Sequence, residues 1–183
     1  VDAGLRDADT GMFRRGPFLV LIEREWARAA RYGGAVALLL VEIDRLRSLT
    51  DAAGPVVADA LLAGLARDVG KRLRGADLLA RYDDAQLAIF LPEADPTGAL
   101  DVADRIREGV EKLTIPGLPA ETRLTASLGV AVMRPASQPL AALLADAASA
   151  TATARQAGGN CVRIAPPDRR RPVPRGSSSG GHA

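Results

Sequence analysis

The sequence predicts an α/β fold, an α+β sandwich in which helices flank a central, mostly antiparallel sheet of about five strands. Two observations predict it. Apolar runs of strand length alternate along the chain with stretches whose apolar residues recur at helical spacing. The 183 residues, 48% hydrophobic and 25% charged, have the composition of a globular protein and suffice for one full core. We therefore expect one domain over residues 1–165.

The first half of the chain contains three helical patterns and one strand. Apolar residues recur at helical spacing over 13–32, and a glycine pair ends the pattern. Residues 35–43 are almost all apolar, which is typical of a strand buried on both faces. A short helical segment over 44–54 follows. A longer helix over 55–74 begins at a proline, a residue favoured in the first helical turn.

The second half adds a hairpin, two helices and two further strands. Residues 78–91 form two apolar runs joined by a polar turn, as in a pair of antiparallel strands. Asp95 is placed to cap the next helix, because Asp is a preferred residue at helix N-termini. The remaining expected elements are a helix over 99–113, a strand over 124–133, a helix over 139–157 and a strand over 160–165.

Histidine and cysteine are nearly absent. His182 is the only histidine and lies one residue from the end of the sequence, and Cys161 is the only cysteine. This composition excludes histidine-based metal sites, Ser-His triads and a disulfide framework. Cys161 is expected to be a small apolar residue of the last strand, in a reducing cytoplasm. Any chemistry must use carboxylates, arginine or lysine, and backbone amides.

The basic charge of the chain is concentrated in residues 166–183. This Pro/Gly/Ser-rich segment carries a net charge of +3, so that residues 1–165 carry −1. A near-neutral domain does not predict a nucleic-acid partner, and no apolar run is long enough to predict a membrane segment. We expect 166–183 to be a disordered, solvated tail.

Carboxylates gather at two predicted turns. Residues 83–87, Asp-Asp-Ala-Gln-Leu, join the two hairpin strands where a tight turn would usually carry Gly or Asn. Glu42 and Asp44 end the first strand, and strand alternation places them on one face. Such carboxylates can hold Mg²⁺ for phosphoryl chemistry. They can equally be polar strand-end residues in water, and spacing alone favours this second interpretation.

Four segments, taken in order, resemble the motifs of the GGDEF domains, the diguanylate cyclases that join two GTP molecules into cyclic di-GMP. The segments are DADTGMFRR (7–15), EIDRLRSLTD (42–51) followed by Gly54 and Asp59, TASLGVA (125–131) and GGN (158–160). They are similar to the family patterns D-x-L-T-G-L-x-N-R, D-I-D-x-F-K-x-x-N-D…G-H-x-x-G-D, T-x-S-x-G-V-A and G-R-N. The resemblance covers residues 5–165 and implies a nucleotidyl-cyclase-like fold.

The resemblance also implies that the catalytic signature is lost. Asp83, Asp84, Ala85, Gln86 and Leu87 stand where the family has Gly-Gly-Asp/Glu-Glu-Phe. The glycines of the family allow a tight turn and the approach of a phosphate, whereas two carboxylates repel one. Ala85 has no ligand atom at the position of a metal carboxylate, and Gln86 cannot carry the negative charge of the following acid. The resemblance therefore predicts a catalytically inactive domain.

Other positions of the family's nucleotide pocket are partly retained. Glu42 stands where the first metal-binding Asp belongs, and Ile43 would offer its carbonyl. Asp59 matches the guanine-binding Asp, Thr50 replaces the guanine-binding Asn, and Arg155 falls near the phosphate-binding Lys. We expect a vestigial pocket with no cofactor. Mg²⁺ is expected only under the alternative that the chain is a diguanylate cyclase with an altered site.

A second ligand site is implied by Arg74 and Asp77. An R-x-x-D motif at this distance from the signature is the inhibitory cyclic di-GMP site in many members of the family. Guanidinium grips phosphate and stacks on bases, and carboxylate accepts hydrogen bonds from guanine. The competing interpretation is a helix-end cation paired with a nearby acid. The family's site often uses a second arginine from another surface, for which Arg105 and Arg107 are both candidates and the sequence does not choose between them.

The expected function is thus that of an inactive GGDEF-type module in cyclic di-GMP signalling. It would either bind cyclic di-GMP at Arg74 and Asp77 or act as a docking and dimerisation domain, with a second copy or a signalling protein as partner. The alternative is a weak diguanylate cyclase, or a regulatory domain that binds GTP without turnover. Retention of Asp59 and Arg155 favours a nucleotide pocket, and loss at Ala85, Gln86 and Thr50 counts against turnover.

Overall fold

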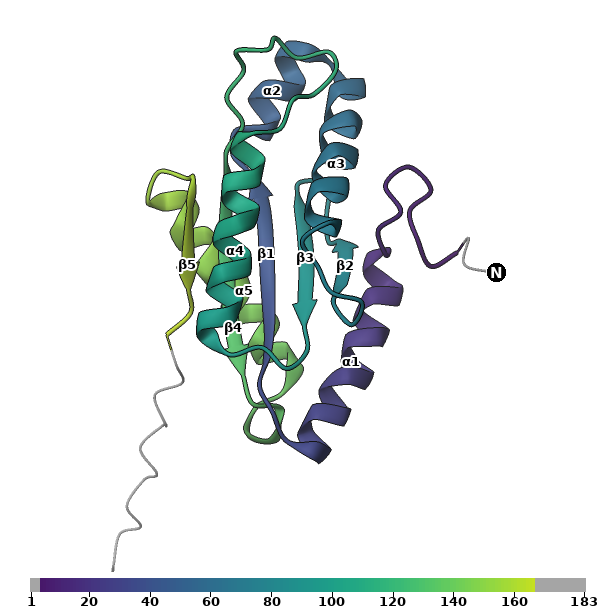
Figure 1. Cartoon of the computed structure of the whole chain (residues 1–183), viewed down its shortest axis with the longest axis vertical. Coiled ribbons are helices and arrows are strands. Elements are labelled where there is room, and N and C mark those ends of the chain that lie inside the picture. Colours follow the sequence, from purple (N-terminus) through teal and green to yellow (C-terminus); the bar gives the residue numbers. More distant parts are fainter. Residues whose placement is uncertain (1–3, 167–183) are drawn as a thin grey trace, which may run out of the picture.

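The computed structural model describes residues 4–166, which form a central sheet with helices on both faces (Figure 1). In chain order the elements are α1 (Arg15–Tyr32), β1 (Val36–Ile43), α2 (Leu46–Ala53), α3 (Pro55–Gly70), β2 (Leu78–Arg81), β3 (Gln86–Leu91), α4 (Pro96–Glu111), β4 (Ala126–Met133), the 3-10 turn η1 (Pro135–Ser137), α5 (Leu140–Gln156) and β5 (Cys161–Ile164). This order confirms the predicted succession of helices and strands.

The sheet has the strand order β2-β3-β1-β4-β5. β1 lies at its centre and pairs antiparallel with β3 and β4, and β2 pairs antiparallel with β3. β5 alone runs parallel to its neighbour, β4. The prediction of a five-stranded, mostly antiparallel sheet is therefore confirmed. Because β1 is central, its eight residues are almost all buried, as its apolar sequence indicates.

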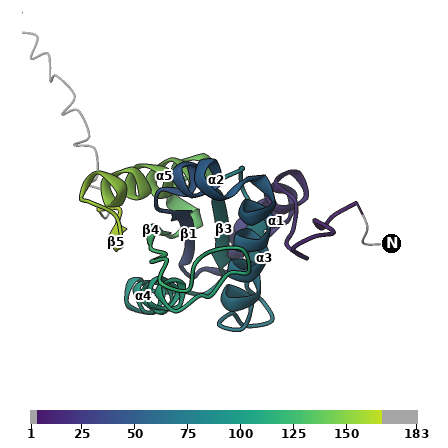
Figure 2. The ribbon, with the colours of Figure 1, turned by 90° about the horizontal axis from the view of Figure 1, so that it is seen from above.

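The two faces of the sheet carry separate hydrophobic clusters. Leu39 and Val41 of β1 belong to the cluster that includes α3 and α4, whereas Leu38 and Leu40 belong to the cluster with α1 and α5. This division follows from the alternation of side chains along a strand. Figure 2 shows α5 and α4 on opposite sides of the strands. Five of the core side chains from α1 and α5 are Phe18, Ile22, Trp26, Leu143 and Ala147.

Element boundaries differ from the predicted ones mainly at the end of α3. The helix ends at Gly70, not at residue 74, so Arg74 lies in the loop before β2 and does not end a helix. Glycine is a poor helix former, and the loop has its own hydrogen bond, from the Arg74 backbone N–H to the Asp77 carboxylate at 2.7 Å. The predicted cap of α4 is confirmed, since the Asp95 side chain accepts from the Gly98 N–H at 2.7 Å.

The N-terminal segment is anchored to the edge of the sheet. Phe13 forms a parallel bridge with Ala80 of β2, and its N–H donates to the Leu79 carbonyl at 3.1 Å. Asp7 accepts from the Asp9 N–H and pairs with Arg81 at 3.4 Å. The hydrogen bond from the Asp9 N–H, followed by those from Thr10 and Arg81, holds the pKa of Asp7 below its ordinary value. The segment therefore lies beside the hairpin of β2 and β3.

The tail predicted for 166–183 lies, apart from Pro166, outside the described residues. Within 4–166 no helix combines the length and the apolar composition needed to cross a membrane.

Candidate functional site

The end of β1 brings Glu42 and Arg155 together across 113 residues of sequence. Nη1 of Arg155, in the last turn of α5, lies 2.8 Å from Oε2 of Glu42. The Glu42 side chain is 19% exposed and that of Arg155 is 54% exposed, so the carboxylate is the more enclosed partner. On the neighbouring strands Glu42 faces the neutral residues Gln86 and Ser127. Arg155 therefore supplies the counter-charge for Glu42.

Asp44, the second carboxylate at this strand end, accepts three hydrogen bonds from the protein. Its oxygens accept from the hydroxyls of Thr125 at 2.7 Å and Ser127 at 2.6 Å, and from the Asn160 N–H at 2.8 Å. Gly159 leaves room for it, because a Cβ there would lie 2.7 Å from an Asp44 oxygen. Asp44 thus ties together the ends of β1, β4 and β5.

These donor groups do not fit the Mg²⁺ ion that the resemblance implies for an active member. Glu42 is paired with Arg155, Asp44 already accepts three hydrogen bonds, and Ala85 offers no oxygen from its side chain. Across the described part of the chain, no group of three or more His, Cys, Asp or Glu residues is placed to hold a metal ion. Mg²⁺ is held through several oxygens, including carboxylates, and that donor set is not assembled here.

The hairpin tip turns its carboxylates toward the N-terminal segment. Oδ1 of Asp83 accepts from the Ala85 N–H at 2.8 Å, so this side chain caps the turn itself. Asp83 and Asp84 line a small cavity of about 330 Å³ together with Asp7, Arg14, Arg15 and Arg81. Arg15 also stacks on the Tyr82 ring, 4.3 Å from its centroid. Leu87, the last residue of the altered signature, is buried in the core.

The remaining positions of the predicted nucleotide pocket are dispersed. The Thr50 hydroxyl donates to the Leu46 carbonyl of its own helix at 2.8 Å. Asp59 is exposed on α3, and Ile43 is buried in the core. Of the five positions, the structure brings only Glu42 and Arg155 into direct contact.

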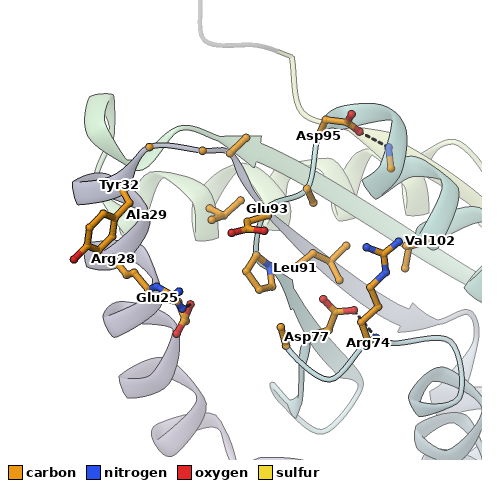
Figure 3. Close-up of a pocket in the computed structure, with 18 of the residues that line it drawn as sticks. Glu25, Arg28, Ala29, Tyr32, Arg74, Asp77, Leu91, Glu93, Asp95 and Val102 are labelled. Carbon is orange, nitrogen blue, oxygen red and sulfur yellow. Dashed lines mark hydrogen bonds and ion pairs between the residues drawn. The ribbon is translucent and has the colours of Figure 1, made fainter.

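A cavity of about 970 Å³ lies at the other end of β1 (Figure 3). One wall comes from α1 and carries Arg28 and Tyr32. The facing wall is the loop between α3 and β2, with Arg74 and Asp77, and Leu91 contributes apolar surface between the walls. Its volume falls in the range of ligand-binding pockets.

Arg74 and Asp77 have different tasks in this wall. The Asp77 carboxylate caps the loop through the Arg74 N–H, as described above. The Arg74 side chain is exposed, and among residues 4–166 its guanidinium has no ion pair or hydrogen bond. The interpretation as a helix-end ion pair is therefore wrong, because Asp77 binds the backbone of Arg74 and not its guanidinium. The cation stays available to a ligand.

Arg105 and Arg107 do not line this cavity. Arg105 pairs with Asp101 at 3.3 Å, and Arg107 pairs with Asp104 at 3.0 Å and Glu111 at 2.8 Å. The hydrogen bond to Asp104 is the main reason that the pKa of Arg107 is raised further. Arg105 and Arg107 therefore lie away from this cavity, and the prediction that one of them serves the site from another surface stays a prediction. The arginines that do line the cavity with Arg74 are Arg28 and Arg72.

Sequence reasoning missed the wall formed by α1. Within residues 4–166 the only ion pair of Arg28 is with Glu25, at 3.9 Å, and the Arg28 side chain is 70% exposed. Tyr32 is 77% exposed, the second-highest exposure of any large hydrophobic residue in the described chain. A helix whose inner face is filled by Phe18, Ile22 and Trp26 should place Tyr32 elsewhere, and that mismatch is the sequence signal that was available.

The family comparison agrees with the motifs. The family model for "Diguanylate cyclase, GGDEF domain" matches residues 5–161. The five-stranded sheet flanked by helices is the α/β architecture that these motifs predict. The chain belongs to the GGDEF-domain family.

The curated relatives include diguanylate cyclases of Escherichia coli. The chain is 29% identical over 160 residues to the probable diguanylate cyclase DgcC of strain K12, which covers 87% of this chain and 43% of the relative. It is 33% identical over 129 residues to diguanylate cyclase DgcM of the same strain, a match that covers 70% of this chain and 31% of the relative. The chain thus spans less than half the length of these relatives.

Solved structures share the fold. The diguanylate cyclase SiaD of Pseudomonas aeruginosa, in complex with its activator SiaC, superposes with a TM-score of 0.84 at 26% identity, covering 90% of this chain and 63% of that one. The GGDEF domain of DgcB from Caulobacter crescentus, in complex with c-di-GMP, superposes with a TM-score of 0.83 at 22% identity. The match covers 90% of this chain and 97% of the DgcB chain.

Proposed function

We propose that this chain is a non-catalytic GGDEF domain that binds cyclic di-GMP in the 970 Å³ cavity, through Arg74 and Asp77. One observation carries the proposal. Asp77 holds the loop by binding the Arg74 N–H, while the Arg74 guanidinium stays unpaired on the wall of the cavity. A pre-ordered, unpaired arginine is suited to an anionic, planar ligand, since guanidinium binds phosphate in a fork and stacks on bases.

The ligand class follows from the chemistry of the two walls. Cyclic di-GMP carries two phosphates and two purines. The cavity offers the exposed guanidinium of Arg74 on one wall, and the exposed guanidinium of Arg28 and ring of Tyr32 on the other. Guanidinium and aromatic faces both stack on bases. The carboxylates of Asp77 and Glu93 are available near the cavity as acceptors for guanine N–H groups.

Absence of turnover is the second part of the proposal. The family's reaction needs a metal to balance the triphosphate charge. In this chain Ala85 and Gln86 supply no carboxylate, and Asp83 and Asp84 add negative charge on the side of the N-terminal segment. These residues support the proposal that the domain binds cyclic di-GMP and does not synthesise it.

A docking role is the second candidate. It is favoured by the similar SiaD structure, which is a complex with the protein SiaC. A domain that keeps the fold and has lost the catalytic carboxylates retains its surfaces for a partner or a second copy. In either case we place the functional domain at 1–165 and regard 166–183 as a basic tail.

Calorimetric titration tests the proposal. The purified chain is titrated with cyclic di-GMP, and separately with GTP and Mg²⁺. We expect binding heat with cyclic di-GMP. Absence of heat at high micromolar ligand would contradict the sensor function and leave docking as the function to test. Heat with GTP and Mg²⁺ but none with cyclic di-GMP would instead support the GTP-binding alternative.

A further inference from the structure

Four acidic side chains of the described chain line the 970 Å³ cavity, and they differ in what they already bind. Three of them have a partner in the protein, either a backbone N–H or a guanidinium: Asp77, Asp95 and Glu25. Glu93 is the fourth. It is exposed, and its carboxylate has no ion pair or hydrogen bond with any of residues 4–166. The acceptor oxygens of Glu93 are therefore available to a ligand.

The backbone holds Glu93 in a conformation that suits glycine better. Its φ is 56°, in the left-handed region, where glutamate is uncommon. The turn is anchored next to it, since the Ala94 N–H donates to the Ala35 carbonyl at 3.1 Å. In Figure 3 Glu93 lies between the α1 wall and the loop before β2. A turn alone would be better served by glycine, so this strained position points to a role for the side chain.

We propose that Glu93 selects guanine over adenine by accepting hydrogen bonds from the edge of one base of the ligand. Guanine presents two adjacent donors, N1–H and the N2 amino group, which match the two oxygens of a carboxylate. Adenine presents an acceptor at N1, so a carboxylate in the same place faces a lone pair and repels it. The inference rests on the proposed function, and it goes further by assigning base selection to Glu93 while Asp77 holds the loop.

Arg74 and Glu93 then have opposite tasks in the cavity. The unpaired guanidinium of Arg74 attracts phosphate whichever base the ligand carries. The carboxylate of Glu93 repels phosphate, and only hydrogen bonds to a matching base outweigh that repulsion. Removing the charge of Glu93 should therefore weaken a guanine ligand and leave an adenine ligand unchanged or more tightly bound.

Calorimetric titration of the whole chain with cyclic di-GMP and with cyclic di-AMP tests this assignment. Glu93→Gln keeps the size of the side chain and replaces one acceptor oxygen by a donor. Its affinity for cyclic di-GMP should fall at least about ten-fold, and its preference over cyclic di-AMP should fall by at least as much. A purely structural role would weaken both ligands together, and a purely electrostatic role would tighten both.

Three further variants make the result specific. Glu121→Gln changes an exposed glutamate that does not line the cavity, so it should match wild type. Glu93→Gly should lose the same preference and keep or raise the thermal midpoint, because glycine adopts this φ without strain. Arg74→Ala should weaken both dinucleotides and leave the preference in place.

Two results would overturn the assignment, and they are distinguishable. If wild type binds cyclic di-GMP and Glu93→Gln leaves the ratio of the two affinities unchanged, Glu93 does not read the base, and the proposed function still stands. If wild type binds neither dinucleotide, the proposed function fails and the role of Glu93 fails with it.

Discussion

The carboxylate of Asp77 accepts the backbone N–H of Arg74 at 2.7 Å, and the two side chains do not pair with each other. This relationship fixes the loop between α3 and β2 and leaves the Arg74 guanidinium unpaired beside the 970 Å³ cavity. A salt bridge between the two side chains would have paired the Arg74 guanidinium with Asp77. Within the described residues, the R-x-x-D segment therefore places an arginine without an ion pair beside the cavity, on a loop held by its own hydrogen bond.

The purified protein should form no cyclic di-GMP from GTP and Mg²⁺. Ala85 supplies no metal carboxylate, and Glu42 is paired with Arg155. Loss of metal stabilisation costs several kcal/mol of activation barrier, and hence orders of magnitude in rate. Product analysis by chromatography checks this. Product above a no-enzyme control that disappears in Glu42→Ala would show that the altered site still works.

Gly129→Ala should destabilise the domain strongly. Gly129 lies on β4 where α5 comes closest, and a Cβ there would overlap the Thr151 side chain and backbone and the Ala147 carbonyl. Overpacking a core typically costs about 1–3 kcal/mol, and more where backbone must move. Chemical denaturation measures the loss. Gly70→Ala is the matched control, since Gly70 is exposed at the end of α3 and a Cβ there meets nothing. Equal stability of the two variants would contradict the close packing.

Replacing Asp7 should reduce stability only above the acidic range. Its pKa is lowered from 3.8 in the folded state, first by the Asp9 N–H and then by Thr10 and Arg81, while burial opposes the shift. A lowered pKa stabilises the fold above the unfolded pKa, and the contribution disappears as pH falls through the folded value. Asp7→Asn should therefore cost roughly 0.5–1 kcal/mol near neutral pH. Denaturation curves at pH 7 and near pH 3 should show this difference shrinking at the lower pH, and a difference that grows there would contradict the assignment.

The fold was predictable from the sequence because its signals are local. The apolar run 36–43 has no polar residue until Glu42, which marks a central strand, and Asp95 caps α4 as its residue type indicates. The end of α3 at Gly70 was not predictable in this way. The loop that follows the helix is held by the hydrogen bond from the Arg74 N–H to Asp77. A pattern of apolar spacing does not register that hydrogen bond.

The site was predictable only in part, because its contacts join residues far apart in the sequence and local patterns do not show them. Glu42 and Arg155 were each visible as charged residues at family positions, but their contact spans 113 residues and depends on how α5 packs. The α1 wall of the cavity depends on the loop geometry between α1 and β1. Arg105 and Arg107 each pair with acids one helical turn away on α4, an arrangement that helical spacing does indicate.

Calorimetry with cyclic di-GMP on wild type and Arg74→Ala tests the central claim most directly, with Arg67→Ala as the matched control on the exposed surface of α3. Charge-assisted contacts to a phosphate are worth about 1.5–3 kcal/mol, and 1.4 kcal/mol is about one decade in affinity. The account predicts at least about a ten-fold loss of affinity in Arg74→Ala and no change in Arg67→Ala, Asp83→Ala or Asp84→Ala. Unchanged affinity in Arg74→Ala, or no binding by wild type, would contradict it.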